Sequence, residues 1–340
     1  MQSRYVQEAR LGLSIASNSG LPPAEMGELA RAAEDAGYDA VFVAEVNGDA
    51  LTLCHPMIAA TESVSVGTAI ANAALRPPVL AAKTAALLDD ASGGRFRLGL
   101  GLANAAKNAQ FGLPQHPPLQ MIEEYVAVVR AVLAGEPGFN GGIFRTGRVP
   151  LDRPPHRPDL PVHLAALGPR MLRLAGRIAD GVILNLMSPA RAAEAVAAVR
   201  ESAAAAGRDP ADVEIVCVVH TCLADDAAAA ARGACAIVPR YALHPAAPSL
   251  FGDPLDTVRE LARAGDWAGA VRHVPQHVAD SFVAHGDPAA CSARIEEYRK
   301  AGVDLPVLYP VPVDGAWPYA DVITGLAPGE RLNTSTTLAE

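Results

Sequence analysis

The sequence predicts an α/β protein built as a (β/α)8 barrel, also called a TIM barrel. Three observations support this prediction. Eight short apolar segments are spread along the 340 residues, helical segments lie between most of them, and the apolar segments show no clean polar alternation. Strands that are covered by helices on both faces have this continuous apolar pattern. Strand–helix alternation repeated to eight strands is typical of a barrel. A doubly wound open sheet is the alternative, because a strand count does not establish closure.

The eight apolar segments are the predicted strands. They are rich in Val, Ile and Leu, and they have the length of strands rather than of helices. In chain order they are Leu11–Ser17, Ala40–Val46, Val64–Ala71, Phe96–Leu102, Val162–Leu167, Gly181–Leu186, Val213–Thr221 and Pro306–Tyr309.

The predicted helices carry apolar residues at three- and four-residue spacing, which indicates one buried face. Several of them begin with Pro near the first turn and end at Gly, as helices commonly do. Examples are Pro23–Asp35, Pro78–Leu88, Gln120–Ala134, Pro169–Ala179, Pro189–Ala206 and Pro288–Ala301.

Two connections are too long for one helix each, and we expect them to be insertions after the fourth and seventh strands. Residues 104–161 include a Pro- and Gly-rich segment, residues 135–158, that is predicted to cross one end of the barrel. Residues 224–305 are expected to hold extra helices. No change of composition marks a second domain. We therefore predict a single barrel domain over residues 1–340, with a loosely held polar tail at residues 325–340.

The composition excludes several classes of function. Asp and Glu number 37 against 28 Lys and Arg, and the net charge of −9 argues against a nucleic-acid-binding surface, which needs a basic patch. No segment approaches the roughly 18 apolar residues of a membrane span, and residues 1–10 lack the apolar core of a signal peptide. The five cysteines form no Cys-x-x-Cys motif, which favours reduced thiols. We expect a cytoplasmic protein.

Glycines at the end of the fourth strand form an incomplete motif. Gly99 and Gly101 match a dinucleotide-binding pattern, but Asn104 occupies the third glycine position, so the match is weak. We interpret the two glycines instead as allowing a flat ring to lie against the strand backbone.

Two other patterns are expected to have no catalytic role. A proline between His273 and His277 excludes a zinc-binding helix, so we predict no metal site. Acidic pairs on the predicted helices, such as Asp89 and Asp90, are expected to lie on solvated faces.

Two strand-to-helix turns predict a phosphate site. After the fifth strand, Gly168 and Pro169 lead directly into a helix that carries Arg170 in its first turn. After the sixth strand, Asn185 and Ser188 offer polar side chains before the next helix. Free N–H groups and the positive end of the helix dipole favour an anion at such turns. Because the two strands are adjacent, we predict one phosphate cup at the carboxyl end of the barrel.

Polar residues also end other predicted strands, where barrel enzymes carry their functional groups. Glu45 ends the second strand, and a carboxylate there is costly to bury unpaired, so we expect it to face a ligand. Asn72 follows the third strand and precedes Arg76. His220 lies near the end of the seventh strand, where a packed core histidine is the alternative interpretation.

Several longer segments, in this order, resemble the luciferase-like monooxygenase superfamily and, within it, the oxidoreductases that use the deazaflavin coenzyme F420. The matching pieces cover most of the chain. They are Glu28–Glu45, Asp49–Thr52, Gly67–Asn72, Ser92–Gly101, Ala165–Gly181, Ala206–Pro210 and His285–Cys291.

The resemblance implies where the coenzyme lies. The deazaflavin ring is expected at the carboxyl end of the barrel, against a non-prolyl cis peptide bond that by position joins Ala69 and Ile70. The phosphate is expected on the turn of Gly168, Pro169 and Arg170 and on the backbone around Asn185, Met187 and Ser188. Glu45 matches the acidic position that the family has near the ring. The resemblance also implies a homodimer.

The sequence departs from the family after the fourth strand. Relatives commonly carry His or Glu there, whereas this chain has Ala103-Asn-Ala-Ala-Lys-Asn108. The usual proton donor is therefore absent, or Asn104 or Lys107 replaces it, with Asn72 and His220 as further candidates. The coenzyme is a polyanion, so we expect basic groups at the mouth of the site, of which Arg76, Lys107 and Arg170 are the candidates.

The function implied by the resemblance is hydride transfer between C5 of the deazaflavin and a small organic substrate. An FMN-dependent luciferase-like monooxygenase is one alternative, because the same barrel holds FMN. A catalytically idle barrel that binds flavin or acts as a scaffold is the other, and the loss of the usual polar residues after the fourth strand supports it.

Overall fold

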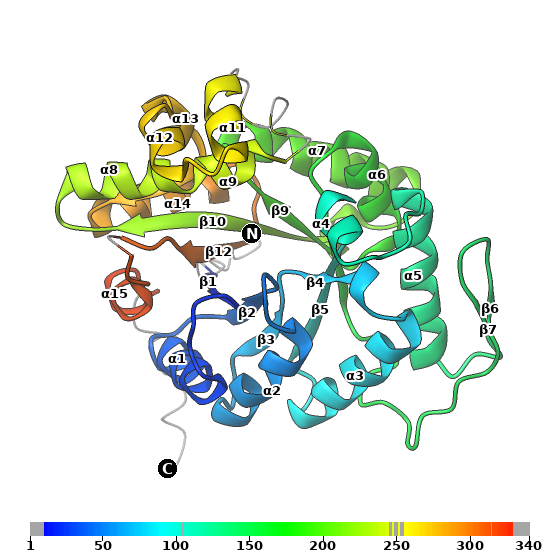
Figure 1. Cartoon of the computed structure of the whole chain (residues 1–340). Helices are drawn as coiled ribbons and strands as arrows, with labels where there is room; N and C mark the ends of the chain where they lie inside the picture. Colours follow the sequence, from blue (N-terminus) through cyan, green and yellow to red (C-terminus); the bar gives the residue numbers. More distant parts are fainter. Residues whose placement is uncertain are drawn as a thin grey trace, which may run out of the picture.

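Eight parallel strands close into a barrel in the computed structural model (Figure 1). The structure describes residues 10–328 apart from residues 104, 245–246, 248–250, 252–254 and 314, and it does not describe the side chains of residues 105–107. The predicted polar tail, residues 325–340, therefore lies largely outside the described residues, as does Asn104.

The strand order around the barrel confirms closure. Neighbouring strands pair in parallel from β1 to β12, and β12 pairs back with β1, which excludes the open sheet. Each of the eight predicted strands is present. The wall consists of β1 (Gly12–Ala16), β2 (Ala40–Ala44), β3 (Ser65–Thr68) with β4 (Ala71–Asn72), β5 (Phe96–Gly101), β8 (Val162–Ala165), β9 (Gly181–Asn185), β10 (Glu214–Leu223) and β12 (Leu305–Pro310).

Helices surround the barrel, and six of them match the predicted segments. α2 (Ala50–Ala60) was not predicted, because Pro56 inside it breaks the usual helical pattern. The helices around the wall are α1 (Pro23–Asp35), α2, α3 (Pro78–Ala91), α5 (Pro118–Leu133), α6 (Pro169–Ile178), α7 (Pro189–Ala205), α14 (Pro288–Lys300) and α15 (Tyr319–Gly325). Within the described residues, no helix combines the length and the apolarity that a membrane span needs.

The insertion after the fourth strand carries a projecting hairpin. It contains α4 (Ala105–Gln110), α5 and the two short strands β6 (Phe139–Asn140) and β7 (Arg145–Thr146), which stand away from the barrel (Figure 1). Glu124 of α5 accepts hydrogen bonds from the backbone N–H groups of Gly142, Ile143 and Phe144, and these bonds fasten the hairpin to the helix.

The insertion after the seventh strand forms a helical lobe on one side of the barrel opening (Figure 1). Apolar residues of the lobe form their own buried cluster against Leu186, Cys222 and Val311. The lobe consists of α8 (Ala227–Ala236), α9 (Val238–Ala242), α11 (Asp256–Arg263), α12 (Trp267–Arg272), α13 (Gln276–Phe282) and the strand β11 (Val283–Gly286).

Strand β11, which was not predicted, changes the wall of the barrel. β10 pairs with β9 from Glu214 to Val218 and with β11 from His220 to Leu223. We call this exchange of partners the wall junction. The carboxyl ends of β9 and β10 therefore separate, and the chain that follows β9 is free to form a turn.

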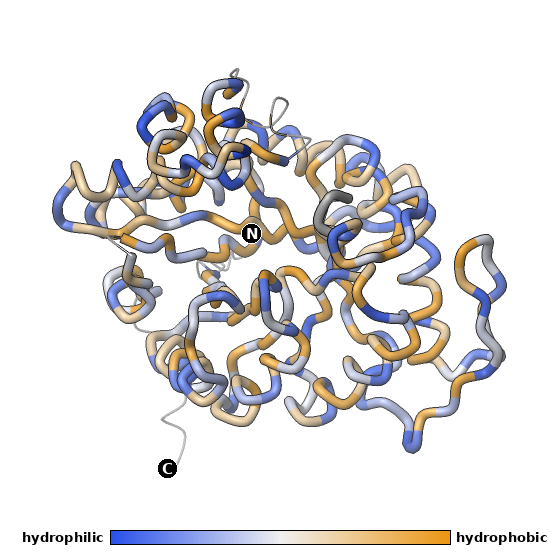
Figure 2. Tube along the Cα trace, viewed as in Figure 1, coloured by the Kyte–Doolittle hydropathy of each residue, from blue (hydrophilic) through white to orange (hydrophobic). Residues whose placement is uncertain are grey.

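The core consists of two layers, one inside the barrel and one between the strands and the helices. The inner layer includes Phe42, Ile183 and Val218, and the partly buried side chains of Ala69 and Ile70 lie against it. The outer layer is larger and includes Leu13, Tyr125 and Val162. Figure 2 shows apolar residues along the strands and hydrophilic residues on the outer faces of the helices.

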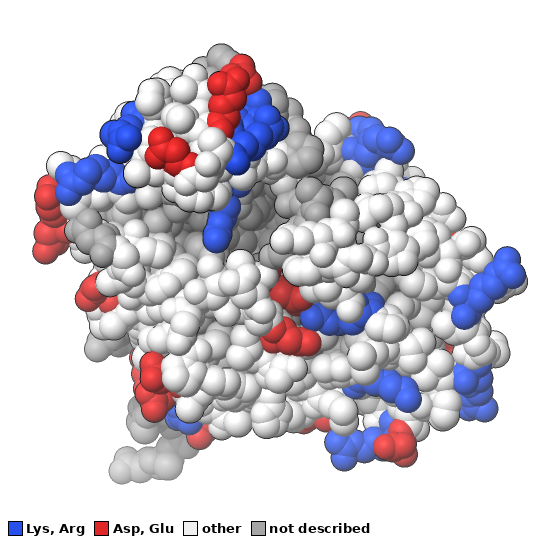
Figure 3. Space-filling model, in the orientation of Figure 1, with Lys and Arg blue, Asp and Glu red and all other residues white. Residues whose placement is uncertain are grey.

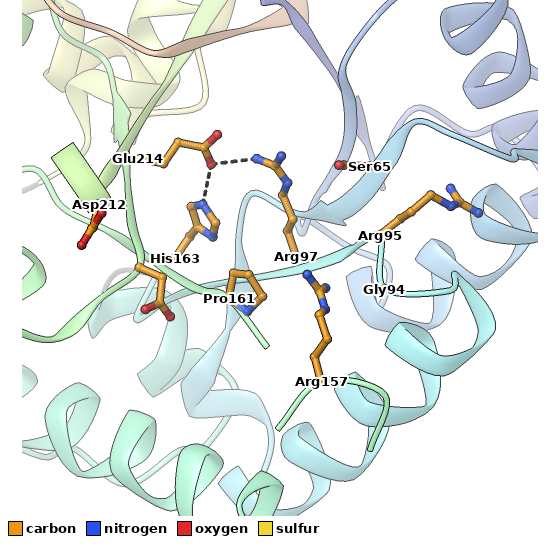
Figure 4. Close-up of a pocket in the computed structure, with 10 residues that line it drawn as sticks. Ser65, Gly94, Arg95, Arg97, Arg157, Pro161, His163, Asp212 and Glu214 are labelled. Atoms are coloured by element: carbon orange, nitrogen blue, oxygen red, sulfur yellow. Dashed lines mark hydrogen bonds and ion pairs between the residues drawn. The ribbon is translucent and has the colours of Figure 1, made fainter. Parts of the chain in front are cut away.

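A cluster of charges fills the amino-terminal end of the barrel. Glu214 begins β10, and its carboxylate contacts Arg10 Nη1 at 2.7 Å. The same carboxylate contacts Arg97 Nη1 at 2.7 Å and His163 Nε2 at 2.8 Å, and Figure 4 draws these two contacts. Arg97, His163 and Glu214 line a hollow of about 430 Å³. Burial alone raises the pKa of Glu214, but the His163 hydrogen bond and the two arginine charges outweigh burial and hold the pKa well below its ordinary value.

The buried position of Asp89, at the same end of the barrel, contradicts one prediction. Its side chain is fully buried, whereas a solvated face was expected. The Arg157 guanidinium donates to both carboxylate oxygens of Asp89 and to the carbonyl oxygen of Phe96, so the pair joins a helix to the start of β5. The sequence pattern missed this contact because Arg157 lies 68 residues further along the chain.

We expect Glu214→Gln to lower the free energy of unfolding at pH 7 by about 2 kcal/mol, because it leaves two arginines with one neutral partner. The pKa of Glu214 is lower in the folded chain than in the unfolded chain, so its contribution is present at pH 7 and is lost as the pH falls below about 4.3. Urea unfolding at pH 7 and pH 3.5 should show a difference that shrinks at the lower pH. Asp212→Asn, which alters an exposed carboxylate of the same hollow, is the control. Equal stability of wild type and Glu214→Gln at pH 7 would contradict this account.

Candidate active site

Between β3 and β4 the chain contains one residue more than the neighbouring strand β5, and this bulge forms the first part of the candidate site. β3 pairs with β5 at Val66 and Gly67, and pairing resumes where β4 meets β5, so residues 68–70 lie opposite residues 98–99. The Thr68 hydroxyl closes the gap by donating to the Gly99 carbonyl oxygen at 2.7 Å and accepting from the Gly99 N–H at 3.0 Å. The bond between Ala69 and Ile70 is a cis peptide, at the predicted position.

Gly99 and Gly101 serve this bulge and do not expose the strand to a ring. A Cβ on Gly99 would lie 1.8 Å from the Thr68 carbonyl oxygen, and one on Gly101 would lie 2.9 Å from the Ile70 side chain. Both spaces are therefore filled by the protein itself. The half-exposed side chains of Ala69 and Ile70, rather than the glycines, present an apolar surface at the carboxyl end of the barrel.

Glu45, directly after β2, is tied to Arg76. Arg76 Nη2 lies 3.1 Å and 3.0 Å from the two carboxylate oxygens of Glu45, and Nη1 donates to the carbonyl oxygen of Asn72. The side chains of Glu45 and Arg76 are only 5% and 9% exposed. Burial raises the pKa of Glu45 above its ordinary value, and the charge of Arg76 partly counters this shift. The Arg76 charge is thus used within the protein and is not free for a polyanion.

Asn72 is also engaged within the chain. Its Oδ1 accepts from the N–H of Ala74 at 3.0 Å, and its Nδ2 donates to Oδ1 of Asn108 at 2.9 Å. Asn108 in turn donates to the carbonyl oxygen of Leu102. Asn72 therefore connects the bulge to the chain that follows β5. Of the other candidates in that segment, Asn104 and the side chain of Lys107 lie outside the described residues.

The turn after β8 contains a glycine that the fold itself does not require. Gly168 caps α6 with a φ of −99°, which any residue adopts. A Cβ on Gly168 would meet no atom within 4 Å, so it would project into open space. Pro169 begins the helix and Arg170 follows it on the exposed surface. The first turn of a helix has N–H groups without helical acceptors, and the space beside Gly168 lets a phosphate reach them.

Side chains of the turn after β9 fix its backbone through hydrogen bonds. Oδ1 of Asn185 accepts from the N–H of Leu186 at 2.8 Å, and Leu186 has a φ of +56°. Met187 is buried, and Ser188 then caps α7, with its Oγ accepting from the N–H of Arg191. The turns after β8 and β9 end neighbouring strands, as the prediction of one phosphate cup requires.

His220 is paired with Asn185 across the wall junction. Its Nε2 lies 3.0 Å from Oδ1 of Asn185. That oxygen also accepts from the Leu186 N–H, which fixes the amide orientation and identifies Nε2 as the protonated nitrogen. The buried Nδ1 has no partner among the described residues. Burial lowers the pKa of His220 to about 3, so the imidazole is neutral. The rings of Tyr241, Phe282 and Tyr309 surround it.

The site residues thus form two groups on the same end of the barrel. Glu45, Asn72 and Arg76 lie around the bulge, and Gly168, Asn185, Ser188 and His220 lie around the two turns and the wall junction. Figure 3 shows a hollow on this face of the molecule, beside the helical lobe, with acidic and basic side chains both visible near it.

Sequence reasoning missed two residues that shape this end. Thr68 ends the short strand β3, and a hydroxyl at the end of a largely buried strand was the signal. Tyr298 occupies a buried position of α14, where its hydroxyl donates to the carbonyl oxygen of Met187. A tyrosine on a buried helix face gives no sequence signal of the partner that it finds.

Comparison with known proteins identifies relatives along nearly the whole chain. The model of the luciferase-like monooxygenase family matches residues 3–305. A 5,10-methylenetetrahydromethanopterin reductase of Methanolobus tindarius is 29% identical over 298 residues, which are 83% of this chain and 89% of the relative. A Mycobacterium tuberculosis protein named as a coenzyme F420-dependent oxidoreductase is 31% identical over 330 residues, 88% of this chain and 94% of the relative.

A solved structure agrees with these relatives. The coenzyme F420-dependent tetrahydromethanopterin reductase of Methanopyrus kandleri superposes with a TM-score of 0.84 at 25% identity, and the match covers 97% of this chain and all of that chain. Family model, relatives and fold point the same way: the chain belongs to the luciferase-like monooxygenase family.

Proposed function

We propose that this chain is a coenzyme F420-dependent oxidoreductase that transfers a hydride between C5 of the deazaflavin and a small organic substrate. The relatives named above support the coenzyme. The observation that carries the proposal is the turn at Gly168. Neither backbone conformation nor packing within the chain requires glycine there, so the missing side chain makes room for a group that the chain does not supply.

The residues around the bulge and the turns fit such a coenzyme. Ala69 and Ile70 offer a half-exposed apolar surface on which a flat ring can lie. The turns that end at Pro169 and Ser188 offer helix N-termini to a phosphate, and Arg170 lies exposed beside the first of them. Lys107 follows β5 and remains a candidate for the anionic tail. When bound, the coenzyme supplies or takes the hydride at C5.

The chain's own contribution is positioning, exclusion of water and control of one proton. Among the four proposed catalytic residues, Glu45 fits proton transfer best, because burial raises its pKa above its ordinary value and so favours the protonated carboxyl. Asn72 orients the bulge through its bonds to Ala74 and Asn108. His220 is neutral, and with Nε2 committed to Asn185 it can accept a hydrogen bond at Nδ1 but holds no acidic proton. Asn104 remains the candidate on the chain after β5.

An FMN-dependent monooxygenase is the second candidate, because the family is named for monooxygenases. The apolar surface at Ala69 and Ile70 suits an isoalloxazine ring equally well. A barrel that binds coenzyme without turnover remains the third possibility, and Arg76 is consistent with it, since its charge is neutralised by Glu45.

The proposal extends to assembly and location. We propose a homodimer, because α3 exposes Leu80 and Leu87 to 54% and 64%, and Leu75 beside its start is 40% exposed. Residues 80 and 87 are two helical turns apart and share one face.

We also propose that the barrel and its two insertions form a single cytoplasmic domain. The five cysteines, all free and buried, are consistent with a reducing compartment.

Purified protein should bind F420 and not FMN. Titration followed by the absorbance and fluorescence of each coenzyme measures both dissociation constants. Tight binding of FMN without binding of F420 would contradict the proposal.

Reduced F420 should then be oxidised in the presence of at least one member of a panel of enones, imines and ketones. Binding without turnover on the whole panel would favour the idle barrel.

Gly168→Ala should weaken F420 binding at least tenfold, because the new methyl group enters the space proposed for the phosphate. Its φ of −99° allows alanine, so the thermal midpoint of unfolding should not fall. Gly147→Ala is a matched control, since a Cβ at Gly147 also meets no atom within 4 Å and this glycine follows the projecting hairpin. Unchanged F420 affinity in Gly168→Ala would contradict a phosphate at this turn.

Replacing Leu80 and Leu87 together by Lys should convert a dimer to a monomer, because it places charges on the apolar face of α3. Sedimentation equilibrium over a range of concentrations gives the molecular mass. Trp267→Lys is the control, as Trp267 is 49% exposed on the helical lobe. A monomeric wild type, or a dimer that survives both lysines, would contradict this interface.

A further inference from the structure

The wall junction leaves a gap behind the turn that follows β9. β9 stops pairing with β10 at Asn185, and β11 begins to pair with β10 at Val283. The two chain segments beside the gap, Met187 after β9 and Phe282 before β11, therefore have no strand ladder between them. Their carbonyl oxygens need a hydrogen-bond donor from elsewhere, because both residues are buried.

The hydroxyl of Tyr298 supplies that donor. It lies 2.6 Å from the carbonyl oxygen of Met187 and 3.1 Å from that of Phe282. The tyrosine comes from α14, which packs outside the barrel, and it is 1% exposed. A hydroxyl has one hydrogen, so the shorter contact, to Met187, is the stronger bond. Tyr298 thus fixes the Met187 carbonyl by a hydrogen bond from the outer, helix-covered side of the barrel wall.

The position of this carbonyl decides where the next N–H group points. The bond from Met187 to Ser188 is trans, because the cis bond of the described chain is at Ala69 and Ile70. In a trans peptide unit the carbonyl and the N–H point in opposite directions. With its carbonyl fixed toward Tyr298, the unit directs the Ser188 N–H away from α14. Asn185 holds the preceding residue, Leu186, through its N–H, so the turn is fastened on both sides of this peptide.

We propose that Tyr298 is a positioning residue that aims the Ser188 N–H at the phosphate of the coenzyme. The inference rests on the proposed function, and it adds a residue of α14 that touches no ligand. Without the Tyr298 hydroxyl, the Met187 carbonyl loses its donor and the peptide unit can rotate. The affinity for the phosphate then falls, while the contacts to the deazaflavin ring on Ala69 and Ile70 remain.

The test compares two ligands, F420 and the same deazaflavin without its phosphate and tail. Tyr298→Phe should weaken F420 binding about tenfold, the size expected for one hydrogen bond to a charged group. It should change binding of the phosphate-free deazaflavin less than twofold. Tyr38→Phe is the matched control, because the Tyr38 hydroxyl is also buried and donates to a backbone carbonyl, that of Val322, away from the turn. It should change neither affinity.

A second pair of variants tests the N–H itself if Tyr298→Phe does not fold. Ser188 has a φ of −67° and a ψ of 160°, which proline adopts. Ser188→Pro removes the N–H together with the capping hydroxyl, and Ser188→Ala removes the hydroxyl alone. Ser188→Pro should therefore bind F420 about tenfold more weakly than Ser188→Ala, with equal affinity for the phosphate-free ligand.

The outcomes distinguish failure of the proposed role of Tyr298 from failure of the proposed function. Wild-type protein that binds F420 while Tyr298→Phe binds it equally well would overturn the role of Tyr298 and leave the proposed function intact. Equal loss of both ligands in Tyr298→Phe would also overturn it, because that result indicates general damage. Wild-type protein that binds neither ligand would overturn the proposed function and this inference with it.

Discussion

The hydrogen bonds of the Thr68 hydroxyl to the Gly99 backbone underlie the arrangement of the carboxyl end of the barrel. They allow β3 to carry one residue more than β5 without leaving the Gly99 amide unpaired. The extra residue turns Ala69 and Ile70 toward the barrel opening, where the Glu45 N–H donates to the Ile70 carbonyl oxygen. Arg76 then joins Glu45 to the Asn72 carbonyl oxygen. Removal of the bulge would thus displace each of these groups.

The two ends of the barrel use charge in different ways. At the amino-terminal end, Glu214 pairs with Arg10 and Arg97, and Arg10 also lies 4.0 Å from Asp39, so these charges are paired within the protein. Its hollow offers no excess of either charge, which fits the stabilising role of that face in barrels. At the carboxyl end, the first turns of α6 and α7 offer backbone N–H groups in addition to side-chain donors such as Nε of Arg191, which has no partner among the described residues. An acidic protein can therefore bind a polyanion without a basic surface, provided that backbone N–H groups are aimed correctly.

The sequence was sufficient for the barrel, the cis peptide and the two turns of the proposed site, but not for the contacts that their residues make. Runs of Val, Ile and Leu identified the strands because both faces of each strand are buried. Glycine and proline identified the turn at Gly168. By contrast, Asp89 finds Arg157 far along the chain, and the spaces beside Gly99 and Gly101 are filled by Thr68 and Ile70. Such partners follow from tertiary packing, which local periodicity does not encode. The strand β11 and the bond from Tyr298 were missed for the same reason.

A crystal structure of the protein with F420 tests most directly whether the bulge and the two turns together form one deazaflavin site. We expect the ring against Ala69 and Ile70, with the phosphate between the turn at Gly168 and the N–H of Ser188. A ring bound elsewhere, or a phosphate held in the amino-terminal hollow beside Arg97, would contradict the account.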